Sequence, residues 1–107
     1  MFKVTKERTF TRTVEVMVPS DGGHTKETCT ATYRVVDIDE LDNTHTLDGQ
    51  QTLLQRVVVD LGDLVGDDGK EVPYSDELRD ELIRVPYMRA ALLRTYMEAV
   101  AGARVGN

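Results

Sequence analysis

The spacing of the apolar residues changes near Ile38, and this change constrains the fold more than any other feature of the sequence. Over residues 10–18, "FTRTVEVMV", apolar side chains occupy the even positions with Arg12 as the exception, and over 28–35, "TCTATYRV", they occupy the odd positions. Such alternation is typical of half-buried strands. The intervening "PSDGG", residues 19–23, has turn composition, so the sequence predicts an antiparallel hairpin.

After that point the apolar residues recur at helical intervals. Asp48 and Gln51 have the spacing of a capping box, and a helix is predicted at about 49–60. The same spacing at 37–40 predicts a single helical turn. The run "VVV" at 57–59 also suits a strand, so both structures stay open there. The apolar stripe of the predicted helix consists of Leu53, Leu54, Val57, Val58 and Leu61.

Two further helices are predicted after an acidic connector. The stretch "GDDGKEVPYSDE", residues 66–77, supplies turn residues and then Ser75 at the position of an N-cap. A helix is therefore predicted at about 76–84. Pro86 ends it and suits the first turn of the next helix, at about 87–101.

Strands followed by helices predict an α+β fold, and a length of 107 residues suits a single domain. Residues 1–36 form the β-rich part, 37–101 the helical part and 102–107 a frayed tail. The hairpin packs against three C-terminal helices, and "MFKV" at residues 1–4 would extend it to a three-stranded meander. A strand interleaved between the helices would contradict this order.

The net charge of −6 is concentrated in the middle of the chain. Residues 37–81 have a balance of −11, against +2 over 1–36 and +3 over 82–107. Phosphate binding needs a basic face, so nucleic acid is not an expected partner, although so acidic a segment also suits an inhibitor that mimics nucleic acid. No apolar run approaches the roughly eighteen residues of a membrane span, and no signal peptide is visible. We expect a cytoplasmic protein without a membrane partner.

The sequence contains residue types that bind metals or catalyse reactions, but their spacing matches no known metal-binding or catalytic motif. An EF-hand register with Gly69 at its sixth position places Leu64 at the first, where a carboxylate is needed, and the other registers also fail. His24 and His45 are predicted to be loop residues without a second ligand nearby. Cys29, the only cysteine, is predicted to be a buried thiol. No nucleophile set or phosphate loop can be assembled. We expect no metal, no cofactor and no enzymatic activity.

Three stretches form an ordered series of features: "DGQQTLLQRVVVDLGDL", "GDDGKEVPYSDELRDELIRVPY" and "MRAALLRTYMEAVAG". They give an aspartate-led helix with an apolar end, an acidic glycine turn with a "VPYS" step, and two helices divided near a proline. This series, about two thirds of the chain, resembles the tail assembly chaperones of long-tailed bacteriophages. Leu61 stands where that family would be expected to have a tryptophan.

The resemblance implies a function in virion morphogenesis in the host cytoplasm. Proteins of that family bind the tape measure protein, keep it soluble and assist assembly of the tail tube around it, without entering the virion. They have no catalytic residues and commonly have a longer, frameshifted form. The tail tube protein and a homo-oligomer are further candidate partners. The alternatives are a tail-completion or head–tail connector protein, or an acidic inhibitor that mimics nucleic acid.

The last predicted helix carries more apolar surface than its own core requires. One stripe, Met88, Leu92, Tyr96 and Ala99, suits packing on the domain. Further apolar residues widen the arc well beyond that stripe, and methionine adapts well to helical clients. The predicted partner-binding residues are Leu93, Met97, Val100 and Ala101. Burial of the same residues within the domain or in a homo-oligomer is the alternative.

Overall fold

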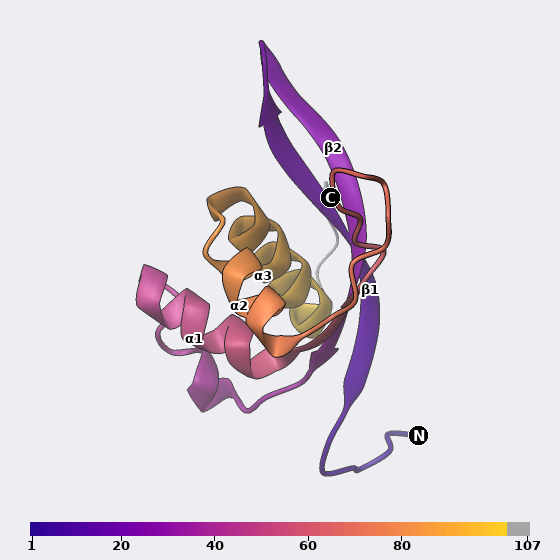
Figure 1. Ribbon diagram of the computed structural model, residues 1–107. Coiled ribbons are helices and arrows are strands. Elements are labelled where there is room, and N and C mark those ends of the chain that lie inside the picture. Colours follow the sequence, from indigo (N-terminus) through magenta and orange to yellow (C-terminus); the bar gives the residue numbers. More distant parts are fainter. Residues whose placement is uncertain (103–107) are drawn as a thin grey trace.

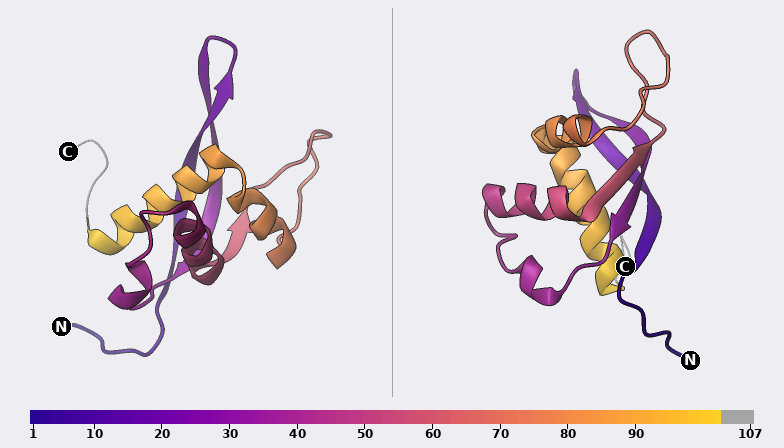
Figure 2. Two further views of the ribbon diagram at one scale, coloured as in Figure 1. Left: turned by 90° about the vertical axis from the view of Figure 1, so that its left-hand side faces the viewer. Right: turned by 60° about the horizontal axis from the view of Figure 1, so that its bottom comes forward.

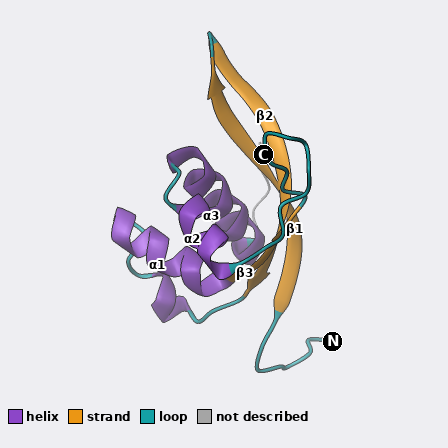
Figure 3. Cartoon of the chain, viewed as in Figure 1, coloured by secondary structure: helices purple, strands orange, loops and turns teal. Residues whose placement is uncertain are grey.

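The computed structural model describes residues 1–102. Its elements in chain order are β1 (Thr9–Ser20), β2 (Gly23–Arg34), the 3-10 helix η1 (Ile38–Leu41), α1 (Leu47–Val57), β3 (Val58–Gly62), α2 (Asp76–Ile83) and α3 (Pro86–Ala101). The three strands form an antiparallel sheet in the order β1-β2-β3, and the helices cover one of its faces (Figure 1). A long loop joins β3 to α2 (Figure 3). The predicted α+β class is confirmed.

The hairpin is longer than the sequence predicted. Pairing continues from Thr9 opposite Arg34 to Ser20 opposite Gly23, so residues 24–27 belong to β2 and the turn shrinks to two residues. One of these, Gly22, has a φ of 77°, a conformation that glycine adopts without steric cost. The end of the hairpin extends beyond the helices (Figure 2). Apolar alternation marks burial rather than pairing, so it stops where the helices no longer cover the strands.

The third strand does not come from residues 1–4, as predicted, but from Val58–Gly62. It lies between α1 and α2, so the predicted order of strands before helices was wrong, and the helical part 37–101 is interrupted by a strand. The strand alternative that the sequence left open at 57–59 is confirmed for residues 58–59. The predicted helix at about 49–60 spans 47–57 instead. The helix ends at Val57 and the strand begins at Val58, inside the valine run 57–59. Valine is β-branched, and β-branched residues favour the extended state.

A register shift in β3 explains why its residues also fit a helical stripe. Val58 pairs with Tyr33 and Asp60 with Thr32, so one extra residue, Val59, is accommodated between the two pairs. This irregularity is a β-bulge, which lets Val58 and Leu61 both lie on the buried side. Their spacing of three residues is the spacing of a helix face. Sequence periodicity alone therefore could not separate the two structures.

Three of the predicted helix boundaries are made by the expected residues. The Ser75 hydroxyl accepts a hydrogen bond from the Leu78 N–H at 3.0 Å, Pro86 begins α3, and Gly102 ends it with a φ of 70°. The start of α1 differs, because Thr46 rather than Asp48 is its N-cap and accepts from the Gly49 N–H. Of the tail predicted at 102–107, only this glycine lies within the described residues.

The core lies between the sheet and the helices and confirms the predicted strand faces. On one face of the hairpin, alternate residues in the part covered by the helices are buried, and Cys29 is among them as predicted. The opposite face of the two strands carries six threonines, none of them fully buried. The buried residues are Val14, Val16, Cys29, Ala31, Tyr33, Leu53, Leu54, Val57, Val58, Leu61, Ile83, Met88, Ala91, Leu92 and Tyr96.

Two tyrosine hydroxyls join the sheet to α3. The Tyr33 hydroxyl donates to the Leu92 carbonyl at 2.9 Å. The Tyr96 hydroxyl donates to the Arg34 carbonyl at 3.1 Å and accepts from the Val36 N–H at 3.2 Å. The two rings lie 5.2 Å apart between centroids. The Tyr33 hydrogen bond is buried and therefore shielded from water, and the two bonds of Tyr96 are partly buried.

Replacement of the second tyrosine tests this connection. Tyr96→Phe keeps the ring but removes the acceptor of the Val36 N–H, so we expect the free energy of unfolding to fall by about 1–2 kcal/mol. Urea denaturation should show a lower midpoint with an unchanged slope. The control is Tyr87→Phe on the same helix. Tyr87 is 39% exposed, so loss of its hydroxyl should change the free energy of unfolding by less than about 0.5 kcal/mol. Equal effects of the two variants would contradict the inferred role.

Alkaline pH should also destabilise the fold. Burial raises the pKa of Tyr33 and of Tyr96 above the ordinary value of 10.0. In the unfolded chain both phenols ionise near that value, whereas in the folded protein they stay protonated, so the unfolding free energy falls as pH rises above about 10. Urea midpoints measured at rising pH should show this fall. The double variant Tyr33→Phe, Tyr96→Phe should show a shallower one, and an unaltered pH dependence would contradict the explanation.

Candidate functional site

The acidic and histidine residues of the described structure do not have the arrangement of a metal site. Among residues 1–102, no group of three or more His, Cys, Asp or Glu side chains is arranged to hold a metal ion. Asp68 accepts from the Lys70 N–H at 2.9 Å, which is a turn contact. His24 lies in β2 opposite Pro19, not in a loop as predicted, and His45 lies in the turn before α1. In the same residues, no helix is long and apolar enough to cross a membrane.

An acidic hollow of about 650 Å³ lies between η1 and α1. Four carboxylates line it together with one base, Arg56, whose Nε lies 3.1 Å from a carboxylate oxygen of Glu40. Other acids of the segment 37–81 lie on the loop after β3 and on α2, where Asp76 and Asp80 both pair with Arg79. The acidic residues of the middle segment are therefore divided among several elements, and part of their charge is paired. The carboxylates of the hollow are Asp39, Glu40, Asp42 and Asp48.

A second hollow, of about 350 Å³, is mainly apolar and lies beside the projecting part of the hairpin. Its walls come from the hairpin, from the start of the loop after β3, and from the junction of α2 with α3, where Pro86 redirects the chain. Nine of its twelve lining residues are apolar. We call it the apolar hollow, and its lining residues are Val16, Val18, Glu27, Thr28, Cys29, Asp63, Leu64, Val65, Leu82, Val85, Tyr87 and Met88.

The charge of the apolar hollow has a single sign. Glu27 and Asp63 are its only charged lining residues, and neither makes a salt bridge with another described residue. Burial, and secondarily the charge of Asp63, raises the pKa of the Cys29 thiol in its wall. The thiol therefore stays protonated near neutral pH. Sequence reasoning missed this hollow because four separate chain segments build it, and no short motif marks it.

The predicted partner-binding residues lie beside the core rather than wholly free of it. Met88, Leu92 and Tyr96 are buried as predicted, and Ala99 is half-buried. The partner-binding set flanks this stripe. Three of its members, Leu93, Met97 and Val100, are half-buried against the core, and Ala101 is exposed. Ala90, which the sequence analysis did not single out, is exposed on the same side. The outer side of α3 is defined here as Ala90, Leu93, Met97, Val100 and Ala101.

The two arginines of α3 turn back toward the domain. Arg89 donates to the side-chain oxygen of Gln50 on α1 at 3.0 Å, and Arg94 donates to the Glu15 carbonyl on β1 at 2.8 Å. Their guanidinium groups therefore lie against neighbouring elements. The outer side of α3 is left with apolar side chains.

Comparison of the chain with protein-family models, with curated proteins and with solved structures gives no match. Assignment of a function to this chain therefore depends on its own residues and geometry.

Thiol reactivity tests the environment of Cys29. Because the thiolate is the reactive form and the thiol is buried, we expect an aromatic disulfide reagent to react at least about tenfold more slowly with the folded protein than with the chain in urea. Asp63→Asn removes the negative charge that disfavours the thiolate. It should speed the reaction of the folded protein only. Equal rates in the folded and unfolded wild-type protein would contradict the inferred burial.

Proposed function

We propose that the protein is a phage tail assembly chaperone that binds the helical tape measure protein through the outer side of α3. In this role it acts in the host cytoplasm, keeps the client soluble while the tail tube assembles around it, and does not enter the virion. The observation that carries the proposal is the orientation of Arg89 and Arg94, which leaves that side apolar.

A surface helix of an isolated domain normally presents polar side chains to water. In α3 the charged residues are Arg89, Arg94 and Glu98, and the two arginines contact α1 and β1. Apolar patches that persist on a surface mark interaction sites. An amphipathic client helix can pack along such a side, and the flexible thioether of Met97 adapts to different client residues.

The elements that pack behind α3 hold it in a fixed position, which suits a binding role. The hydroxyls of Tyr33 and Tyr96 fix the helix to the sheet, and α1 and α2 pack against it as well. A surface that is ordered before binding loses less conformational entropy on association than a flexible one. The helix with Asp48 in its first turn, the acidic turn and the two helices that end in α3 are also the features that resemble the phage family.

Substitutions on the outer side of α3 test the proposal. Ala90→Asp and Met97→Asp place a carboxylate in the contact, and each should reduce co-purification of the tape measure protein by at least about tenfold, equivalent to 1.4 kcal/mol. Ala90 is exposed, so its substitution should change the unfolding free energy by less than about 1 kcal/mol. Leu93→Asp should act in the same direction, with a larger cost in stability because that residue is half-buried.

The matched control is Gln55→Asp, which adds the same charge on the exposed side of α1 and should leave co-purification unchanged. Retention of the client by both folded variants, Ala90→Asp and Met97→Asp, would exclude the outer side of α3 as the binding surface. Mass spectrometry of purified virions separates a chaperone, which should be absent, from a tail-completion or connector protein, which should be present.

A further inference from the structure

The first eight residues form an arm that displays apolar and basic side chains without cover. The exposed fractions of Phe2 and Val4 are 83% and 89%. The guanidinium carbon of Arg8 lies 5.1 Å from the centre of the Phe2 ring, and the same side chain donates to the Lys3 carbonyl, so the arm is bent. Its charged side chains are Lys3, Lys6, Glu7 and Arg8, with a net charge of +2.

The apolar hollow has the complementary chemistry. Its walls are mainly apolar, its two charged residues are the carboxylates Glu27 and Asp63, and none of the cationic side chains of residues 1–102 lines it. A volume of about 350 Å³ is enough for bulky side chains to enter. An occupant that matches both properties carries a large apolar residue directly beside a cation, which is the composition of the arm at Phe2 and Lys3.

We propose that the apolar hollow binds the N-terminal arm of a second copy of this chain. Phe2 enters the hollow among the side chains at the junction of α2 with α3, with Val4 at its edge. Lys3 and Lys6 then lie near Glu27 and Asp63, where opposite charges favour the contact. This interface does not include the outer side of α3, so it stands independently of the proposed client.

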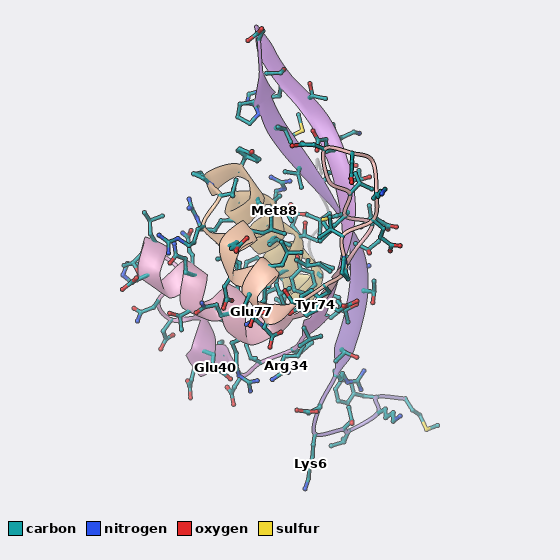
Figure 4. All side chains as sticks on the ribbon, viewed as in Figure 1. Lys6, Arg34, Glu40, Tyr74, Glu77 and Met88 are labelled. Atoms are coloured by element: carbon teal, nitrogen blue, oxygen red, sulfur yellow. The ribbon has the colours of Figure 1, made fainter. Side chains whose placement is uncertain are left out.

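A second copy is required because the arm of the same chain lies at the wrong end of the sheet. Figure 4 labels Lys6 on the arm and Met88 beside the hollow, well apart in the molecule. Val16 is seven positions along β1 from Thr9, about 24 Å at the rise of a strand. The seven residues from Thr9 back to Phe2 cover about the same distance only when fully extended. To reach the hollow of its own chain, the arm would also have to reverse direction at its base, which uses part of that length. The arm is therefore too short to fill the hollow of its own chain.

The contact joins two different surfaces, so it is head-to-tail. Such contacts build rings when the rotation between copies closes and open chains when it does not. An interface made by one short arm is small, and small interfaces are weak. Self-association is therefore expected to be concentration-dependent, and to be visible by sedimentation equilibrium at high micromolar concentrations.

The decisive experiment mixes two defective variants. Phe2→Asp removes the apolar residue of the arm, and Val65→Lys places a cation in the hollow at a side chain that is 68% exposed. Each variant alone should associate at least about tenfold more weakly than wild type. Mixed together, they should form a one-to-one dimer with near wild-type affinity, because one intact arm then meets one intact hollow. That dimer should not grow further.

Two controls match the charge changes. Thr9→Asp adds the same charge at an exposed position beside the base of the arm, and Leu47→Lys adds a cation at an exposed position on α1. Both should associate as wild type does. A wild-type chain that stays monomeric overturns the proposal, as does a mixture that fails to form the dimer. If Val65→Lys abolished association and Phe2→Asp did not, the hollow would bind some other part of the second copy. That result would also overturn the proposal.

Discussion

The hydroxyl of Tyr96 joins α3 to the end of β2, and both of the proposed binding surfaces depend on the position of α3. It donates to the carbonyl of Arg34 and accepts from the N–H of Val36. One oxygen thus bonds two backbone groups at the point where β2 ends. Apolar contacts are non-directional, whereas the two hydrogen bonds of the Tyr96 hydroxyl, beside a buried aromatic cluster, are directional. With α3 fixed there, Met88 reaches the apolar hollow and Arg94 reaches β1.

The same contact from Arg94 protects an exposed edge of the sheet. The N–H of Val35 donates to the carbonyl of Arg8, and residues of an antiparallel pair alternate between bonding the partner and pointing away. Odd-numbered residues of β1 therefore direct their backbone groups outward. The Glu15 carbonyl, which is one of these groups, is bonded by Arg94, and Pro19 has no N–H to offer. An unpaired edge invites strand addition, and these two residues reduce that tendency.

The sequence predicts those parts of the fold whose signal is local. The two strand faces follow from alternation, and Ser75 and Gly102 mark helix ends because one side chain or one left-handed residue is enough to do so. Helix and strand stayed open at 57–59 because a bulge gives the strand Val58–Gly62 the spacing of a helix face. The helix surplus beyond the core stripe was predicted from spacing. Whether these surplus apolar residues are buried stayed open, because burial depends on how α1 and α2 pack around the helix.

The apolar hollow is the clearest case of a feature that no local signal carries. Its walls come from β1 and β2, from the loop after β3 and from the junction of the last two helices, and their approach depends on the register of the whole sheet. The arm, by contrast, is visible in the sequence but carries no periodicity, so its exposed Phe2 has meaning only once a complementary surface exists. Head-to-tail copies would repeat the outer side of α3 along an assembly. A long helical client of the kind proposed, meeting several weak sites in series, would be held by their combined effective concentration. A surface of modest size on each copy is then sufficient for a client much longer than the domain itself.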